Sequence, residues 1–188
     1  MIKRYVFGTP LETDAVLNKT AACRDKPPYL GKCENALIYK MDEEDIVYGL
    51  GENVRGMNKR GWIYESNCTD DPVHLEETKY LYGAHNFILV SGEKQFGLFL
   101  DTPGKVVFDI GYTNSSQLKI TLEDGDYELY IIDGGTPDDI ITWFRELIGS
   151  SYLPPKWAFG FGQSRWSYAS SAEVRQVAAR YRENHIPL

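Results

Sequence analysis

The sequence predicts a mainly β protein, an antiparallel β-sandwich followed by one strand and one helix of an α/β fold. Three observations lead to this prediction. Short apolar runs recur between residues 86 and 133 and are separated by brief turns. A helical pattern replaces them at residue 136. Residues 157–162 are then apolar throughout, and a polar break and an amphipathic segment follow them.

The sandwich strands are predicted from short β-type runs joined by turn residues such as Ser-Gly-Glu-Lys, Asp-Thr-Pro-Gly and Asp-Gly. Short connections of this kind favour antiparallel pairing. The expected strands cover residues 5–7, 36–39, 46–52, 86–90, 95–101, 105–112, 118–122 and 127–133.

Residues 53–81 lack a sustained period and are expected to form a long loop, although Trp62, Ile63 and Tyr64 argue against disorder. Loops of this length inside a domain are usually functional or disordered.

A helix is predicted over residues 136–149. Thr136 is placed as N-cap, Pro137 as the first helical residue, and Gly149 directly after the last turn. A stiff connector with paired prolines follows. The expected apolar face consists of Ile140, Ile141, Phe144, Leu147 and Ile148.

The last part of the chain is predicted to be a βα unit. Residues 157–162 are apolar at every position, as in a strand covered on both faces. Ser170 and Glu173 have the spacing of a capping box for a helix over residues 170–184. Such a unit needs partners on both faces of its strand and is not expected to be stable alone.

Composition excludes several classes of partner. The net charge is −7 and no lysine or arginine cluster exists, so nucleic acid is not an expected partner. No apolar run is long enough to span a membrane, and the start lacks the apolar region of a signal peptide. The odd number of cysteines, outside metal spacing, favours a reducing compartment, so we expect a cytoplasmic protein without metal or cofactor.

Two short stretches are candidates for binding a ligand. Arg165 and Trp166 follow the expected strand 157–162, where they could hold a sugar by hydrogen bonds and stacking. The alternative is a loop with a packed tryptophan. Asp70 and Asp71 could act as acid or base or accept sugar hydroxyl groups, and the alternative is an Asx turn before Pro72. No convincing pair of catalytic carboxylates is present.

The segment TPDDIITWFRELIGSSYLPPKWAFGFGQSRWSY, residues 136–168, closely resembles the junction segment of glycoside hydrolase family 31, the α-glucosidase and α-xylosidase family. YGLGE (48–52) and LYGAHNF (81–87) are similar to the N-terminal β domain of that family. The resemblance covers about residues 46–188. It implies a galactose-mutarotase-like sandwich domain over 1–135, a linker helix with a proline-rich connector over 136–155, and the start of a truncated catalytic (β/α)8 barrel over 156–188.

The resemblance implies the N-terminal part of a retaining, exo-acting α-glucosidase that hydrolyses α-glucosidic bonds at the non-reducing ends of oligosaccharides. An α-xylosidase of the same family and a non-catalytic carbohydrate-binding sandwich remain alternatives. The nucleophile and the acid/base of the family are two aspartates on later barrel strands, so none of the residues present is expected to be catalytic.

The resemblance also implies roles for two residues. Asp70, with Asp71 as the alternative, matches a loop aspartate that hydrogen-bonds substrate, and Trp166 matches an aromatic wall of the sugar pocket where tyrosine is common. Arg165 is expected to be a buried structural partner. The expected partners are an α-linked gluco-oligosaccharide and the remainder of the protein's own barrel, and a monomer and a homo-oligomer both remain open.

Overall fold

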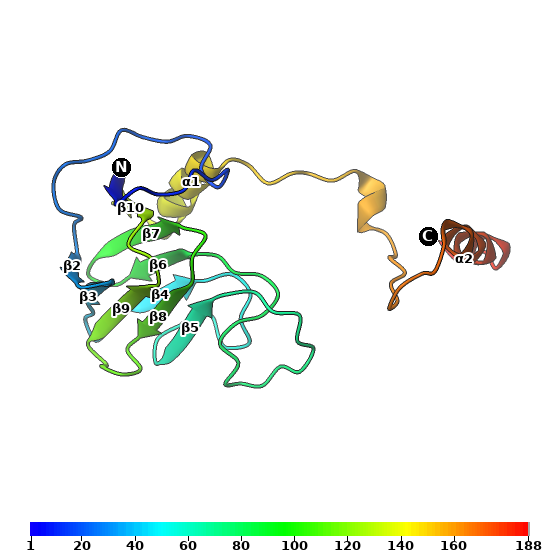
Figure 1. Ribbon diagram of the computed structural model, residues 1–188, viewed down its shortest axis with the longest axis horizontal. Coiled ribbons are helices and arrows are strands. Elements are labelled where there is room, and N and C mark those ends of the chain that lie inside the picture. The colour runs from blue at the N-terminus through cyan, green and yellow to red at the C-terminus, as the bar shows by residue number, and fades with distance from the viewer. Residues whose placement is uncertain (188) are drawn as a thin grey trace. The chain divides into compact units, whose positions relative to one another are not determined.

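The computed structural model describes residues 1–187, which divide into two compact units, Met1–Ser150 and the residues from Ser151 onward (Figure 1). The first unit contains ten strands and helix α1 (Pro137–Ile148). The second contains the short 3-10 helix η1 (Lys156–Phe159) and helix α2 (Ser171–Glu183).

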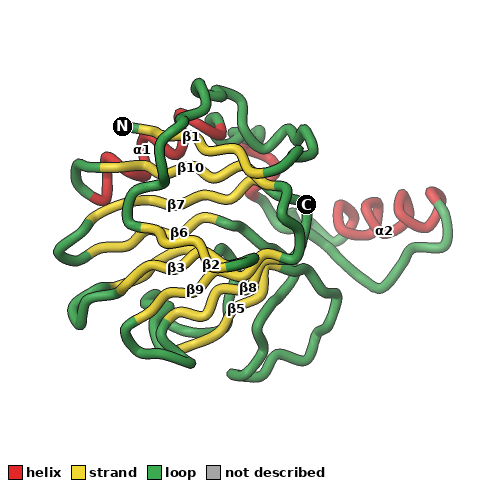
Figure 2. The backbone as a smooth tube through the Cα atoms, turned by 60° about the vertical axis from the view of Figure 1, so that its left-hand side comes forward, coloured by secondary structure: helices red, strands yellow, loops and turns green. Residues whose placement is uncertain are grey.

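The ten strands, drawn yellow in Figure 2, form two five-stranded sheets in which every neighbouring pair is antiparallel. Sheet A has the order β1 (Ile2–Phe7), β10 (Tyr127–Asp133), β7 (Gln95–Asp101), β6 (Phe87–Ser91), β4 (Ile46–Gly49). Sheet B has the order β2 (Leu30–Cys33), β3 (Ala36–Lys40), β9 (Gln117–Leu122), β8 (Val106–Ile110), β5 (Trp62–Ser66). The predicted antiparallel β-sandwich is therefore confirmed.

Strand β10 explains how the first unit builds its two layers of apolar packing. Successive strand residues point to opposite faces of a sheet. Leu129 and Ile131 belong to the main core, which residues of both sheets share. Tyr130 and Ile132 belong to smaller clusters that contain residues of helix α1. Because both faces of β10 are covered, six of its seven residues are buried.

Helix α1 begins at the predicted cap. The Thr136 hydroxyl oxygen accepts the Asp139 N–H at 3.2 Å, and the Asp139 carboxylate accepts the Thr136 N–H at 2.8 Å. The hydrogen bonds that the Asp139 carboxylate accepts from the Thr136 N–H and from the Thr136 hydroxyl lower the pKa of Asp139. The reciprocal pair satisfies two of the N–H groups that the first turn leaves free.

The packing of α1 differs from the prediction at one residue. Ile140 and Leu147 are buried, and the ring of Phe144 stacks on Phe87 at 4.0 Å between centroids. Ile141 was expected on the same face but is 41% exposed. Its position is rotated by about 100° from Ile140 around the helix, which carries it beyond the stripe that touches the sheet. The partly buried Trp143 packs with this cluster instead.

A partly buried ion pair lies on sheet A. Glu128 on β10 is 6% exposed, and its carboxylate accepts hydrogen bonds from the Arg4 guanidinium on β1 and from the Tyr130 hydroxyl. The hydrogen bond from Arg4 is the main reason that the pKa of Glu128 lies below its usual value, although burial acts in the opposite direction. Arg4 also donates to the Thr20 carbonyl at 3.3 Å, so the pair attaches the segment after β1 to the sheet.

Two edge strands were not predicted. Strand β2 is largely exposed, and its sequence, LGKC, has no apolar alternation. Strand β5 lies inside the loop expected over 53–81, and it begins with Trp62, Ile63 and Tyr64. Both strands are at an end of sheet B and owe their conformation to pairing with a single neighbour, β3 or β8. A short sequence run does not reveal that pairing.

The second unit confirms the predicted helix but not the strand before it. Ser170 caps α2, and its side chain accepts the Glu173 N–H at 3.2 Å. Residues 156–159 form η1 in place of the strand expected over 157–162. A parallel strand needs neighbours for its N–H and C=O groups, and the described residues of this unit include no other strand. Trp157, Phe159 and Phe161 are correspondingly exposed by 81%, 67% and 57%.

Candidate functional site

The loop predicted over residues 53–81 contains strand β5. The part between β5 and β6, residues 67–81, is called here the acidic segment. Two backbone hydrogen bonds close its base. The Thr69 N–H donates to the Leu81 carbonyl at 2.9 Å, and the Glu65 N–H donates to the Lys79 carbonyl at 3.1 Å. Leu81 is buried. The ends of the segment are therefore attached to the sandwich, while residues 70–77 are exposed.

Charges strengthen this base. The Glu65 carboxylate lies 2.6 Å from the Lys105 ammonium and 3.4 Å from that of Lys79. Burial of Glu65 opposes its ionisation, but the hydrogen bonds and charges of the two lysines outweigh that effect and lower its pKa. The Glu65 carboxylate therefore stays ionised at neutral pH. It links Lys105, just before strand β8, to Lys79 of the acidic segment.

Arg55 joins the acidic segment from the other side. Its Nε donates to the Glu76 carbonyl at 2.8 Å, and its Nη1 donates to the Ile63 carbonyl at 3.1 Å. The guanidinium carbon lies 4.0 Å from the centre of the Trp62 ring and 5.2 Å from that of Tyr64. Strand β5 thus supplies an aromatic surface on which the arginine stacks.

A buried lysine lies beside this cluster. Lys59 is 6% exposed, and its ammonium donates to the Gly56 carbonyl at 3.0 Å. Burial, followed by the positive charge of Arg55, lowers the pKa of Lys59. Its ammonium also lies 5.6 Å from the centre of the Tyr64 ring. The loop between β4 and β5 is therefore organised around two cations and two aromatic rings.

The two predicted aspartates have different environments. The Asp71 Oδ1 accepts the Val73 N–H at 2.9 Å, which is the Asx turn given as the alternative interpretation. Asp71 also borders a cavity of about 370 Å³ together with His74, Glu77 and other residues of the segment. Asp70 is exposed on the same segment, one residue beyond the attached Thr69.

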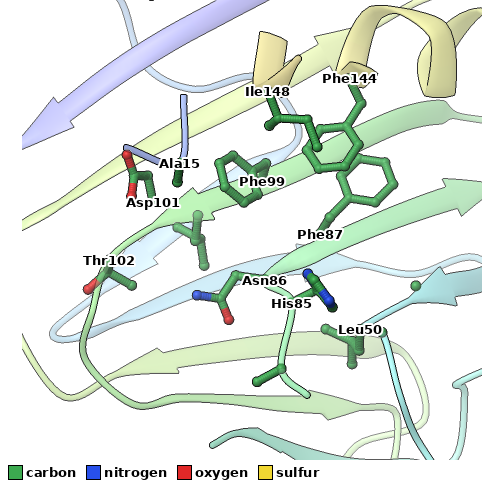
Figure 3. A pocket seen from close by; sticks show the side chains of 14 residues that line it. Ala15, Leu50, His85, Asn86, Phe87, Phe99, Asp101, Thr102, Phe144 and Ile148 are labelled. Atoms are coloured by element: carbon green, nitrogen blue, oxygen red, sulfur yellow. The ribbon is translucent and has the colours of Figure 1, made fainter. Parts of the chain in front are cut away.

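A second cavity, of about 530 Å³, lies where the YGLGE and LYGAHNF motifs meet (Figure 3). Gly49 has φ 118°, and a Cβ at this residue would lie 2.3 Å from the Phe87 carbonyl oxygen, so the turn after β4 requires glycine there. Phe87, Phe99 and Phe144 form an apolar wall, and the Asn86 side-chain oxygen is buried without a hydrogen-bond partner among the described residues. Such a surface suits a ligand or another part of the protein.

In the second unit, the loop before α2 is fastened by Glu173. The Glu173 carboxylate accepts the Ala169 N–H at 2.8 Å and pairs with Arg165 at 2.9 Å. Arg165 is thus a structural partner as expected, but its side chain is 53% exposed, not buried. Its partner Glu173 lies on the short amphipathic helix itself, at the surface, which leaves the guanidinium accessible. Trp166 is fully exposed, so the alternative of a packed tryptophan is wrong within the described residues.

Asp70 and Trp166 belong to different compact units, and each is placed within its own unit only. No group of three or more histidine, cysteine, aspartate or glutamate side chains among residues 1–187 is arranged to hold a metal ion. The structure contains no helix that combines the length and apolarity needed to cross a bilayer, within the part of the chain it describes.

Sequence reasoning missed the Arg55 cluster and the cavity beside Phe87. The spacing of Arg55, Trp62 and Tyr64 carries a signal only once residues 62–66 are known to be a strand, because Trp62 and Tyr64 then point to the same face. Part of the cavity lining belongs to the YGLGE and LYGAHNF motifs. The other lining residues Phe99 and Phe144 come from β7 and α1, which are distant in the sequence, so the motifs alone do not indicate a cavity.

Comparison with known proteins places these features in a family. Residues 16–109 match the sequence model of the glycosyl hydrolase 31 N-terminal galactose mutarotase-like domain, and residues 151–188 match that of the glycosyl hydrolases family 31 TIM-barrel domain. The first match lies within the sandwich unit. The second begins where the second unit begins.

Individual relatives agree with these matches. Alpha-glucosidase 2 of Bacillus thermoamyloliquefaciens is 38% identical over 150 residues, which are 79% of this chain and 19% of that protein. An alpha-xylosidase of Saccharolobus solfataricus is 30% identical over 154 residues, 80% of this chain and 20% of that protein. A solved dextranase of glycoside hydrolase family 31 from Flavobacterium johnsoniae superposes with a TM-score of 0.70 at 26% identity, covering 84% of this chain and 20% of that one.

The chain thus spans about a fifth of the length of these relatives. Its sandwich matches the first domain of the family, and its second unit matches the family's barrel domain over 38 residues of sequence. The chain therefore belongs to glycoside hydrolase family 31.

Proposed function

We propose that this chain is the N-terminal part of a retaining, exo-acting α-glucosidase that removes glucose from the non-reducing ends of α-linked oligosaccharides. The observation that carries the proposal is the 38% identity to an α-glucosidase over 150 residues, against 30% to the α-xylosidase over a similar length. The α-xylosidase activity of the same family is the competing assignment.

The proposed domain division follows the family. Residues 1–135 would form the sandwich domain, 136–155 a linker with a proline-rich connector, and 156–188 the start of the catalytic barrel. The match of residues 151–188 to the barrel domain supports the last part. Helix α1 packs on sheet A, so the first part of the proposed linker lies in the same compact unit as the sandwich.

In this proposal the chain contributes substrate contacts and not catalytic carboxylates. A retaining glycosidase uses two carboxyl groups about 5 Å apart, one as nucleophile and one as general acid and base. We assign these to later strands of the barrel. Asp70 would accept hydroxyl groups of the non-reducing sugar, which an exposed carboxylate can do. Trp166 would form an aromatic wall of the sugar pocket, which its full exposure permits.

The test is hydrolysis of nitrophenyl α-glucoside and nitrophenyl α-xyloside by the full-length gene product, with the 188-residue chain alone as the control. We expect a higher kcat/KM for the glucoside, no turnover by the control, and α-glucose as the first product in proton NMR. An inactive full-length protein, or β-glucose as the first product, would contradict the proposal. A preference for the xyloside would select the α-xylosidase assignment.

A carbohydrate-binding module without catalysis is separated from both enzymes by calorimetric titration. The exposed aromatic side chains of the second unit motivate this alternative. Saturable binding of maltose to the 188-residue chain, together with an inactive full-length protein, would favour the module.

A further inference from the structure

We propose that Arg55 is a positioning residue that holds the acidic segment (residues 67–81) in the conformation in which Asp70 meets the substrate. Arg55 would touch no sugar itself. This inference rests on the proposed function, because it assigns a purpose to the loop that is expected to carry the substrate contact.

Arg55 connects three parts of the first unit that are separate in sequence. It lies in the loop after β4, donates to the Ile63 carbonyl of strand β5, and donates to the Glu76 carbonyl of the acidic segment. Strand β5 is paired with β8 along its whole length, so Ile63 belongs to the fixed sheet. Arg55 therefore fixes the distal half of the acidic segment, at Glu76, relative to sheet B.

The acidic segment depends on this attachment because its own packing is weak. Residues 70–77 are all exposed, so buried side chains contribute little to their order. Residues 70–75 lie between two attachment points. These are the hydrogen bond between Thr69 and Leu81 and the hydrogen bond between Arg55 and Glu76. Removing the second point leaves the bond of Glu65 to Lys79 as the next attachment, so the free loop lengthens from residues 70–75 to residues 70–78.

Arginine suits this role better than lysine. The guanidinium donates in two directions at once, to Glu76 and to Ile63, while its flat face lies 4.0 Å from the centre of the Trp62 ring. A lysine ammonium keeps the charge but cannot donate in a rigid fork and stack as a plane. The variant Arg55→Lys therefore removes the geometry and preserves the charge beside Lys59.

The experiment uses the full-length gene product and the variants Arg55→Lys, Asp70→Asn and the double variant. Arg24→Lys is the matched control, because Arg24 is an exposed arginine of the same unit, between β1 and β2. Steady-state kinetics on nitrophenyl α-glucoside are combined with hydrogen exchange of the backbone amides of residues 70–76, apart from Pro72, which has no N–H.

We expect Arg55→Lys to raise KM about tenfold, since a misplaced contact of this kind costs one to two orders of magnitude. We expect kcat to stay within about twofold, because the loop binds the sugar and does not carry the reacting groups. Exchange of residues 70–76 should become faster, and the double variant should be no worse than Asp70→Asn alone, because Arg55 acts through Asp70. The control should behave like the wild type.

Three results would overturn the inference while leaving the proposed function intact, provided that the wild-type enzyme is active. The first is an unchanged KM in Arg55→Lys, and the second is unchanged exchange of residues 70–76. The third is a double variant whose loss equals the product of the two single losses. A lower kcat at unchanged KM would indicate a smaller active fraction, and this also contradicts positioning. A wild-type protein inactive on both glycosides would overturn the proposed function and this inference with it.

Discussion

Gly97 of strand β7 lies under helix α1, and replacing it by alanine tests whether that helix packs on sheet A as described. A Cβ at residue 97 would lie 2.7 Å from the Ile140 Cγ2 and 3.1 Å from the Phe87 ring. Carbon atoms in good contact are about 3.5–4.0 Å apart, so the helix would have to move by roughly 1 Å. Ile140 has no room to rotate away, because it is branched at Cβ and fully buried.

The expected cost can be bounded. Overpacking a core by one methyl group costs about 1–3 kcal/mol. The loss of glycine's freedom in the unfolded chain offsets about 0.4–1 kcal/mol of this. We therefore expect Gly97→Ala to lower the free energy of unfolding by about 1–2 kcal/mol, measured by urea unfolding with near-ultraviolet circular dichroism.

Gly31→Ala in strand β2 is the matched control. The nearest atom that its Cβ would meet is the Ile38 carbonyl oxygen at 3.8 Å, an ordinary contact, so we expect no loss of stability. The double variant Gly97→Ala/Ile140→Ala adds a coupling test. The new methyl group would occupy space that Ile140 vacates. The loss of unfolding free energy in the double variant should therefore be smaller than the sum of the losses in the two single variants. Wild-type stability of Gly97→Ala, or strict additivity, would refute the packing of α1 on this face.

The remaining predictions concern charge and substrate. Arg4→Met should lower the free energy of unfolding by about 1.5–3 kcal/mol, because the buried Glu128 carboxylate loses its charged hydrogen-bond donor and keeps only the Tyr130 hydroxyl and the Lys19 ammonium, 3.7 Å away. Because the pKa of Glu128 is lowered in the folded state, the ionised carboxylate stabilises the fold above its unfolded pKa, and this stabilisation is lost as pH falls. The variant Glu128→Gln should therefore lose less unfolding free energy on acidification than the wild type, as measured by urea unfolding curves at a series of pH values. In the full-length enzyme, Asp70→Asn should lower kcat/KM for nitrophenyl α-glucoside about tenfold or more. Asp71→Asn should change it less than about threefold, because the side-chain oxygen of residue 71 closes an Asx turn. Equal effects of the two variants would contradict the assignment of Asp70. Trp166→Tyr should raise the ratio of glucoside to xyloside kcat/KM about threefold or more, since a smaller wall leaves room for the extra CH2OH group, and an unchanged ratio would remove Trp166 from the pocket.

Much of the candidate site lay outside the reach of sequence reasoning. The sequence predicts a loop over residues 53–81 and indicates Asp70 and Asp71 as its candidate ligand contacts. The sequence does not tell which of the two forms a local turn, because an aspartate before Pro72 is compatible both with an Asx turn, as Asp71 forms, and with a free carboxylate. The attachment of the segment by Arg55 was not foreseen, since it depends on a strand, β5, that the sequence did not reveal.

The sequence by itself determined the elements whose causes are local. Turn residues and apolar runs locate eight of the strands, and caps at Thr136 and Ser170 place the start of both α-helices, because these signals act within a few residues. The family likeness was also legible in contiguous motifs. Only the tertiary structure decided the edge strands β2 and β5, the exposure of Ile141 and the turn at residues 156–159. These depend on which distant backbone supplies hydrogen-bond partners and which surface covers a face, and such non-local contacts leave no fixed spacing in the chain.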